Sequence, residues 1–282
     1  MSARVISGKE VAEEILSNDL RLRVEKLKGK NIVPKLVVIL VGEMKASASY
    51  VAQKEKFAGK AGIESEVRRF EDTISEEEIL DEINKINTDS SIHGVIVQLP
   101  LPKHISVTKV LNSIDPSKDV DGFTPSNVGK LFLGEDTLVS CTPKGIMSIL
   151  KSADVNLTGM NVTVIGRSNI VGKPVSILCQ QQNATVTMCH SKTRDLNAKL
   201  ADADVIIVAA GVPKFINGDQ IPNGAVVVDV GIHNIEGKLC GDVEFESASK
   251  KASAITPVPG GVGPMTVCAL IENTIIAAER SS

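Results

Sequence analysis

Aromatic side chains are scarce in this chain of 282 residues, where they make up 2% of the composition, with no Trp and a single Tyr. Any role that requires a tyrosine therefore falls on Tyr50, because there is no second copy. Stretches of one charge sign are also missing: 31 Lys and Arg stand against 34 Asp and Glu, for a net charge of −3. A chain without a basic face or tail does not suit nucleic acid as its main partner.

Paired cysteines and long apolar runs are absent too. The five cysteines form no CxxC pair, which argues against the usual zinc and redox motifs and favours reduced thiols in a reducing compartment. No uninterrupted apolar run reaches the roughly 20 residues of a membrane helix. The first residues resemble neither a signal peptide nor a transit peptide. We therefore expect a cytoplasmic protein with no membrane partner and no bound metal.

The chain does contain many short apolar runs that are rich in Val and Ile and bounded by turn residues. Such runs are typical of strands buried on both faces of a parallel sheet. Helical spacing of apolar residues separates them, and strands alternating with helices predict an α/β fold. The expected strands are Leu36–Val41, Gly94–Leu99, Val162–Ile165, Ala184–Met188, Val205–Ala210 and Ala225–Val230. The expected helices are Gly8–Leu27, a helix from a capping box at Ser75 to about Asn87, one from Thr142 and Pro143, one after Gly172, and Met265–Glu279.

A chain of this length suits two domains. The segment between Asp115 and Thr142 is dense in turn residues and marks the expected seam. We expect an N-terminal α/β catalytic domain over 1–140, completed by the C-terminal helix over 265–282. We expect a Rossmann-like dinucleotide-binding domain over 141–264, with the active-site cleft between the two domains.

A glycine turn after one expected strand is the first candidate site. Gly166 and Gly172 are separated by five residues, which matches neither GxGxxG nor a Walker loop. A strand, a glycine turn and a helix start still suit a dinucleotide pyrophosphate, because free N–H groups and the helix dipole attract anions. A plain strand–helix turn is the alternative.

The residues around this turn indicate which dinucleotide it would take. Arg167 directly follows the first glycine, and Ser191 and Lys192 stand where NAD-preferring folds carry an acidic residue. A hydroxyl and positive charges suit the extra phosphate of NADP. The neighbouring His190 is interpreted as a loop histidine rather than a catalytic base. The same holds for His93, His104 and His233.

The second candidate site lies in the first half of the chain. Tyr50 and Lys54 share one face of an expected helix at i and i+4. A buried lysine can act as acid or base, although spacing alone favours a solvated helix lysine. Gln98 places a polar group at the end of an apolar strand, where ligands bind in open α/β sheets. Asp119 and Asp121 could be acid/base partners, metal ligands or an Asx-type turn.

Several stretches together resemble the bifunctional methylenetetrahydrofolate dehydrogenase/methenyltetrahydrofolate cyclohydrolase (FolD) family. They occur in the family's order and span nearly the whole chain. They are VG-x3-AS-x2-YV-x2-K, GVIVQLPLP, KDVDGF-x-P-x-NVG, CTP-x-G, GRSNIVGKP, NATVT-x-CHS, DVG and TPVPGGVGPMT.

The resemblance implies an enzyme that oxidises methylenetetrahydrofolate with NADP and hydrolyses the methenyl product to 10-formyltetrahydrofolate, as a homodimer in one-carbon metabolism and purine biosynthesis. It implies that Lys54 is the catalytic lysine, that Tyr50 orders and stacks near the folate, that Gln98 tunes Lys54 and that Asp121 holds the pterin. On the NADP side it implies contacts from Gly166, Arg167, Ser168, Ser191 and the backbone of Ile232.

Three other functions remain open from the sequence. The chain could be an NAD-specific dehydrogenase without hydrolase activity, a non-catalytic dinucleotide sensor, or a two-domain dehydrogenase for another small substrate, because a fold does not determine a function. The positive charge of Arg167 and the hydroxyl of Ser191 argue against the first. The family context of Lys54 and Asp121 argues against the third.

Overall fold

The computed structural model describes residues 2–42 and 45–281, with the backbone alone for residues 45–51. The chain forms two compact units. The three-strand unit consists of Glu14–Cys141 and Val267–Ser282. The six-strand unit consists of Met1–Glu13 and Thr142–Thr266. Each is built on a parallel sheet with helices between its strands, which confirms the predicted two-domain α/β fold.

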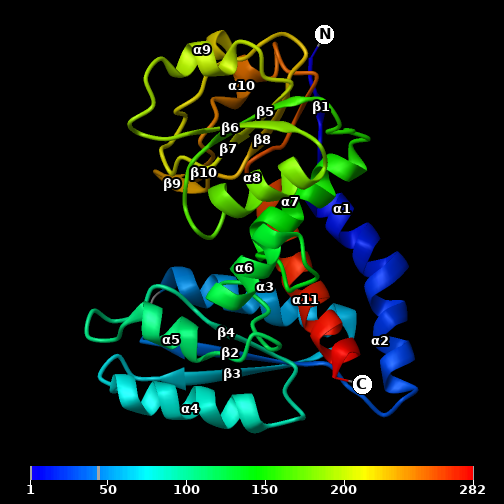
Figure 1. Ribbon diagram of the computed structural model, residues 1–282, viewed down its shortest axis with the longest axis vertical. Coiled ribbons are helices and arrows are strands. Elements are labelled where there is room, and N and C mark those ends of the chain that lie inside the picture. The colour runs from blue at the N-terminus through cyan, green and yellow to red at the C-terminus, as the bar shows by residue number, and fades with distance from the viewer. Residues whose placement is uncertain (1, 43–44, 282) are drawn as a thin grey trace. The chain divides into compact units, whose positions relative to one another are not determined.

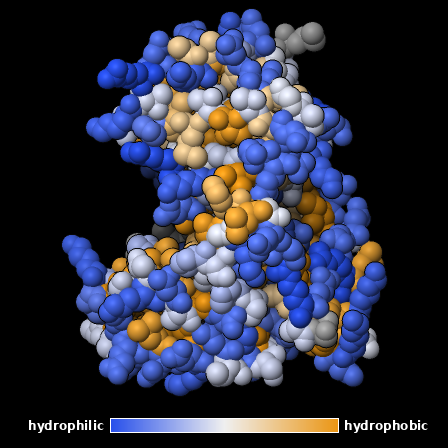
Figure 2. Space-filling model, in the orientation of Figure 1, coloured by the Kyte–Doolittle hydropathy of each residue, from blue (hydrophilic) through white to orange (hydrophobic). Residues whose placement is uncertain are grey.

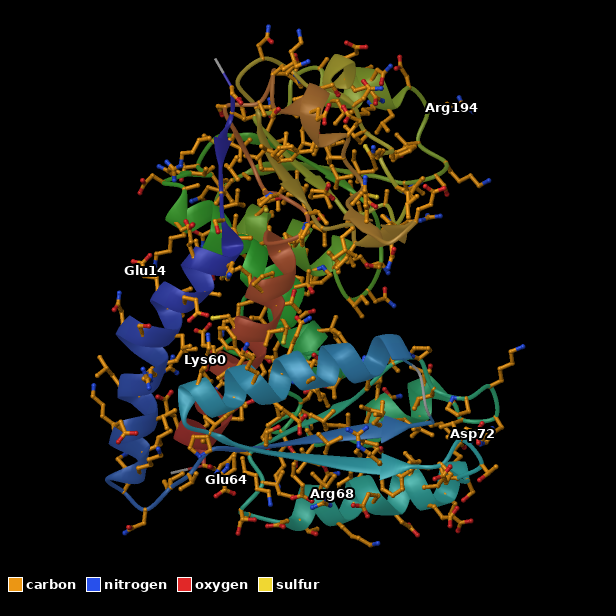
Figure 3. All side chains as sticks on the ribbon, turned by 180° about the vertical axis from the view of Figure 1, so that it is seen from behind. Glu14, Lys60, Glu64, Arg68, Asp72 and Arg194 are labelled. Atoms are coloured by element: carbon orange, nitrogen blue, oxygen red, sulfur yellow. The ribbon has the colours of Figure 1, made fainter. Side chains whose placement is uncertain are left out.

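The three-strand unit has a sheet in the order β3-β2-β4, and both of its pairings are parallel. Its strands are β2 (Lys35–Val41), β3 (Glu64–Phe70) and β4 (Gly94–Val97). Figures 1 and 3 show the first connecting helix on one side of this sheet and the second on the opposite side. The helices of the unit are η1 (Leu16–Leu20), α2 (Arg21–Lys28), α3 (Lys45–Ala61), α4 (Glu76–Thr88), α5 (Val107–Ser113) and α6 (Pro125–Leu133).

Helix α4 shows how sequence spacing becomes packing in this unit. Its capping box is present as predicted, because Glu78 N–H donates to Ser75 Oγ and the Glu78 carboxylate accepts from Ser75 N–H. Ile79, Ile83 and Ile86 follow at helical spacing, and all three are fully buried against the valines and isoleucine of β2 and β4. The apolar stripe of this amphipathic helix thus covers one face of the sheet.

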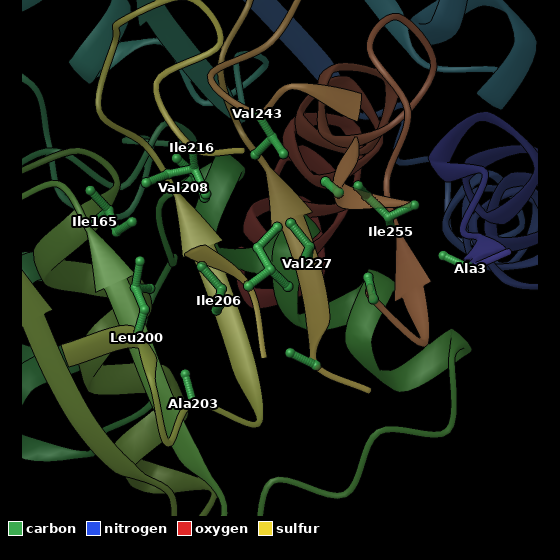
Figure 4. Close-up of a cluster of buried hydrophobic side chains, with 14 of the residues drawn as sticks. Ala3, Ile165, Leu200, Ala203, Ile206, Val208, Ile216, Val227, Val243 and Ile255 are labelled. Carbon is green, nitrogen blue, oxygen red and sulfur yellow. The ribbon is translucent and has the colours of Figure 1, made fainter. Parts of the chain in front are cut away.

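The six-strand unit has the strand order β1-β11-β8-β7-β5-β6, and every neighbouring pair is parallel. Figure 4 shows its core, in which Ile206 and Val208 of one central strand pack beside Val227 of the next. The strands are β1 (Arg4–Val5), β5 (Asn161–Ile165), β6 (Thr185–Cys189), β7 (Val205–Val208), β8 (Val226–Asp229) and β11 (Ala254–Ile255). A separate antiparallel hairpin consists of β9 (His233–Ile235) and β10 (Lys238–Cys240). The helices are α1 (Gly8–Ile15), α7 (Cys141–Ser152), α8 (Gly172–Gln181), α9 (Leu196–Leu200), the 3-10 helix η2 (Gly218–Gln220) and α10 (Phe245–Ala248).

The last helix, α11 (Val262–Arg280), is apolar and long. By length and composition it passes as a membrane-crossing helix, with a mean hydropathy of 1.2, but 67% of that window is buried inside the protein, as in a core helix. The sequence alone predicts no membrane-crossing segment, because α11 contains no uninterrupted apolar run of that length. Asn273 of α11 donates from Nδ2 to the carbonyl oxygens of Val120 and Val139, both at 2.8 Å. Figure 2 shows hydrophilic side chains over most of the visible surface.

The predicted strands are confirmed within one or two residues, and the helix over Gly8–Leu27 is confirmed as a run interrupted by a π-helical turn. The helix expected from Thr142 begins slightly earlier, at Cys141. The largest difference lies at the N-terminus, which was placed in the first domain. Residues 1–13 group with the six-strand unit, because β1 pairs with β11 and Ile6 N–H donates to the Ile255 carbonyl at 2.8 Å.

Candidate active site

The side chains of Lys54 and Gln98 meet in the three-strand unit. Lys54 lies in α3 and Gln98 directly follows β4, 44 positions later. Lys54 Nζ donates to Gln98 Oε1 at 2.9 Å, and Gln98 Nε2 donates to the Leu99 carbonyl at 3.0 Å. The second bond fixes the orientation of the amide, so that its oxygen faces the lysine. Lys54 is therefore a half-buried lysine with a defined partner rather than a freely solvated one.

The two aspartates after β4 have different environments, and for Asp119 these favour the turn among the alternatives left by spacing. Asp119 is 1% exposed. Its carboxylate accepts from Phe123 N–H at 3.2 Å, Thr124 N–H at 2.7 Å and Asn127 Nδ2 at 2.9 Å. Asp119 thus organises the turn that leads into α6, where Thr124 is the N-cap.

The Asp121 carboxyl instead lies close enough to Lys54 for the two charges to interact. Burial raises the pKa of the Asp121 carboxyl above its usual range, the positive charge of Lys54 acts to lower it, and the charge of Asp119 adds to the rise. The Cys141 thiol also bonds to this carboxyl and lowers its pKa. Lys54, Gln98 and Asp121 thus form one polar group, which we call the Lys54 cluster. Tyr50 lies one helical turn before Lys54 in α3, and its side chain is outside the described residues.

The glycine turn of the six-strand unit is built by close backbone approach. A Cβ at Gly166, which has φ of +133°, would lie 2.3 Å from the Ala209 carbonyl oxygen. A Cβ at Gly172 would lie 2.2 Å from the carbonyl oxygen of Gly166. Both positions therefore exclude any side chain. Ser168 Oγ accepts from the N–H groups of Val171 at 3.1 Å and Gly172 at 3.3 Å, so it supports the start of α8.

Arg167 and Ser191 extend from neighbouring strand ends. In the register of β5 and β6, Ile165 pairs with Cys189, so both candidate residues lie two positions beyond the pair. Both side chains are exposed, and among the described residues Arg167 makes no hydrogen bond or ion pair. No acidic residue occurs between Cys189 and Arg194. The turn, the guanidinium and the hydroxyl fit a dinucleotide that carries an additional phosphate.

Ile232 follows β8 and is 50% exposed. Two of the histidines accept hydrogen bonds from backbone N–H groups. His190 Nδ1 accepts from Lys192 N–H at 3.1 Å, and His93 Nδ1 accepts from Lys35 N–H at 3.1 Å. Across residues 2–42 and 45–281, no group of three or more His, Cys, Asp or Glu side chains could hold a metal ion.

The sequence interpretation missed two groups near these sites. The Cys141 thiol, beside Asp121, is one; a lone cysteine in a CTP segment gave no signal of this contact. The other is the buried pair Asp229 and Asp242 in the six-strand unit, where Asp229 Oδ1 accepts from Asp242 N–H at 2.9 Å. Asp242 directly follows Gly241, and Asp229 stands two positions before Gly231. These neighbouring glycines could have indicated the pair from the sequence.

Comparison with known proteins places these features in one class, the two-domain α/β enzymes that bind a nicotinamide dinucleotide. Two family models match: the catalytic domain of tetrahydrofolate dehydrogenase/cyclohydrolase over residues 6–121, and its NAD(P)-binding domain over residues 140–282. The chain belongs to the tetrahydrofolate dehydrogenase/cyclohydrolase family. The six-strand unit carries most of the NAD(P)-binding match and the three-strand unit most of the catalytic one.

Relatives cover the whole chain. The bifunctional protein FolD of Geotalea daltonii is 54% identical over 279 residues, which is 99% of each chain. The crystal structure of the bifunctional FolD enzyme from Campylobacter jejuni superposes with a TM-score of 0.97 at 46% identity, covering 99% of both chains. The FolD structure from Trypanosoma brucei, complexed with NADP and an inhibitor, gives a TM-score of 0.95 at 37% identity over 100% of this chain and 99% of that one.

The contrast between Asp119 and Asp121 gives a matched pair of variants. Asp119→Asn should lower the free energy of unfolding by about 1–3 kcal/mol, because an amide cannot accept all three buried donors. Asp121→Asn should not lower it, because burial already disfavours the charge of that carboxyl. Thermal unfolding of both variants beside the parent protein measures the difference. Equal losses of stability would mean that Asp121 is also part of the turn.

Proposed function

We propose that the enzyme oxidises 5,10-methylenetetrahydrofolate to the methenyl compound with NADP and then hydrolyses that compound to 10-formyltetrahydrofolate. The observation that carries the proposal is the Lys54 cluster, in which a lysine, an amide and a carboxyl from three segments of the chain converge. Membership of the family and the names of its full-length relatives support both reactions. The 10-formyltetrahydrofolate product would supply one-carbon units for biosynthesis, including the synthesis of purines.

The first reaction depends mainly on positioning. Bound NADP accepts the hydride that leaves the one-carbon bridge of the folate. The task of the chain is to hold both reactants in orientation, which contributes up to roughly 7–11 kcal/mol in well-aligned systems. We assign the pterin to Asp121, whose carboxylate can accept paired N–H bonds. Such bonds also replace the water that burial removes from this carboxyl.

The second reaction requires proton transfer. Water adds to the methenyl carbon and loses a proton, and one C–N bond then breaks as its nitrogen gains a proton. We assign these transfers to Lys54, because its Nζ lies 2.9 Å from a neutral amide acceptor and near a carboxyl. Gln98 holds the ammonium in place without adding a charge. Tyr50, one turn earlier in α3, is assigned to the folate ring on the family pattern alone.

We propose NADP as the preferred cofactor. The close-packed turn at Gly166 and Gly172 gives the pyrophosphate a surface of bare backbone beside the start of α8. Ser168 supports this turn, and the exposed Ile232 offers its backbone to the nicotinamide end. Arg167 and Ser191, on adjacent strand ends, would bind the additional phosphate.

One assay separates this proposal from its rivals. The purified protein is given methylenetetrahydrofolate with NADP or with NAD, and methenyltetrahydrofolate is supplied separately for the hydrolysis. An NAD-specific enzyme without hydrolase activity would respond only to NAD and leave methenyltetrahydrofolate unchanged. A dinucleotide sensor would bind the cofactor without turning over, and a dehydrogenase for another substrate would use neither folate.

We further propose a cytoplasmic homodimer whose partners are small molecules and not nucleic acid or membrane. The balanced charge and the five free thiols support this view. Among the described residues, β3 pairs with β2 alone, so the other edge of this seven-residue strand has no strand partner. Edges of this length are usually covered, and a second copy could cover this one. Figure 3 labels Glu64, Arg68 and Asp72 along this strand and just beyond it. Cell fractionation tests the location.

Replacing Lys54 should separate the two reactions. Lys54→Met should abolish the hydrolysis of supplied methenyltetrahydrofolate, because no group remains to move the proton, while some dehydrogenase activity survives. Lys54→Arg should fail in the same way, since a guanidinium stays protonated. Lys56→Met is the matched control, as Lys56 is an exposed lysine two positions further along α3. Near-normal hydrolysis by Lys54→Met would refute the assignment.

Replacing Arg167 should change the cofactor preference. Arg167→Ala should raise the Michaelis constant for NADP by roughly 10- to 100-fold and that for NAD far less, because only NADP has the additional phosphate. Arg194→Ala, on the loop beyond Ser191, is the comparison for a general loss of positive charge (Figure 3). Initial rates with each cofactor provide the measurement. Equal effects on both cofactors would argue against Arg167 as the phosphate ligand.

The oligomeric state can be measured directly. Light scattering on the eluting protein should give twice the chain mass of 29.9 kDa. A mass of one chain at micromolar concentration would contradict the homodimer.

A further inference from the structure

A fully buried carboxylate lies where two strands of the six-strand unit end. Asp242, which has 0% exposure, comes two residues after β10. Its Oδ2 accepts from Ala210 N–H at 2.6 Å and Gly211 N–H at 2.8 Å. Its Oδ1 lies 2.7 Å from Nε2 of His233. The one side chain therefore holds backbone from the loop after β7 and the side chain of the first residue of β9.

Asp229, the last residue of β8, holds Asp242 from the other side. Its Oδ1 accepts from the N–H groups of Gly231 and Asp242, both at 2.9 Å, and its Oδ2 accepts from Val243 N–H at 2.9 Å. Burial raises the pKa of Asp229 to about 6, against these N–H bonds, which lower it. Both carboxylates are thus satisfied almost entirely by loop backbone, as buried charges must be.

The backbone is packed directly against these carboxylates. A Cβ at Gly231 would lie 2.3 Å from Asp242 Oδ1, and a Cβ at Gly241 would lie 1.9 Å from Asp229 Oδ2. Neither glycine has room for a side chain. The segment Gly231-Ile232-His233 is therefore fixed at both ends, by the Asp229 carboxylate before Ile232 and by the Asp242 carboxylate after it.

We propose that Asp242 is a positioning residue of the dehydrogenase reaction, which sets the backbone of Ile232 and of the loop after β7 against the nicotinamide half of the cofactor. This rests on the proposed function. Ligands of open α/β sheets bind beyond the carboxyl ends of the strands, and Ala210, Gly211 and Ile232 all lie there, beyond β7 and β8. Asp242 acts through these residues and does not itself touch the cofactor.

Asp242→Asn tests the proposal. If the amide oxygen stays on Ala210 and Gly211, its NH₂ group faces His233, and the bond to His233 is kept only where Nε2 is unprotonated and can accept it. We expect kcat/KM of the dehydrogenase to fall at least about tenfold, with a weaker Kd for NADP by calorimetric titration. Hydrolysis of methenyltetrahydrofolate, supplied without cofactor, should remain at the parental rate, because it uses the Lys54 cluster of the other unit.

Two further comparisons keep a positioning role distinct from a structural one. Asp204→Asn removes a carboxylate that accepts from Asn161 N–H at 2.8 Å, just before β7 at the opposite edge of the same sheet, and should leave both activities unchanged. His233→Gln keeps an N–H donor for Asp242 and should retain most dehydrogenase activity, whereas His233→Leu should lose it selectively.

The outcomes divide cleanly. A fall in the ratio of dehydrogenase to hydrolase activity for Asp242→Asn, or for His233→Leu if Asp242→Asn does not fold, supports the proposal. Parallel losses of both activities in proportion to folded protein would make Asp242 a structural residue, and an unchanged ratio would overturn the proposal as well. If the parent protein converts neither methylenetetrahydrofolate nor methenyltetrahydrofolate, the proposed function is refuted. The Kd values for NADP would then still test whether Asp242 positions the cofactor site.

Discussion

A sheet whose strands are all parallel must end all of them at one edge, and this constraint places most of the candidate residues of the protein. Gln98 follows β4, Gly166 follows β5, Ser191 follows β6 and Ile232 follows β8. The helices that connect the strands begin at the same edge, so their N–H groups point toward it. In each unit, the loops that connect the strands already bring polar groups together at this edge of the sheet.

The carboxylates shielded from solvent differ in the groups that donate hydrogen bonds to them. Asp119, Asp229 and Asp242 each receive several N–H bonds from nearby loops, and each thereby fixes a turn. Asp121 receives no such bond from a backbone group among the described residues, and its neighbours are a lysine and a thiol. Asp121 is half-buried, and an acid shielded from part of its water gains from a ligand that supplies donors. The difference separates carboxylates that fix turns from the one that we assign to the substrate.

The central strands were predictable from sequence because burial on both faces leaves an unbroken apolar run, as in β2 and β7. Strand β3 was not, since its sequence ESEVRRF carries the charges of a sheet edge and mimics a loop. Two-residue strands such as β1 have no periodicity to detect. Their pairing depends on partners about 250 positions away, as Arg4 opposite Ala254 shows.

The candidate sites were predictable in part. The glycines of the turn after β5 were found by spacing, but the reason for them, contact with the Ala209 carbonyl, is tertiary. Spacing left Asp119 and Asp121 undivided and favoured a solvated Lys54, because the partner that changes this view lies 44 positions away. His233 was taken for a loop histidine, and its bond to Asp242 arises only when the hairpin closes. The family resemblance supplied what local pattern could not.

The pairing of β1 with β11 also constrains the order of events during synthesis. The six-strand sheet cannot gain its outermost strand until residues near 254 have emerged, although residues 4–5 of that strand are made about 250 positions earlier. Residues 14–141 have their own buried core and can collapse in the meantime. A fragment that begins at Thr142 would lack β1. The six-strand unit is therefore not a separable module, because its sheet is made from two distant segments of the chain.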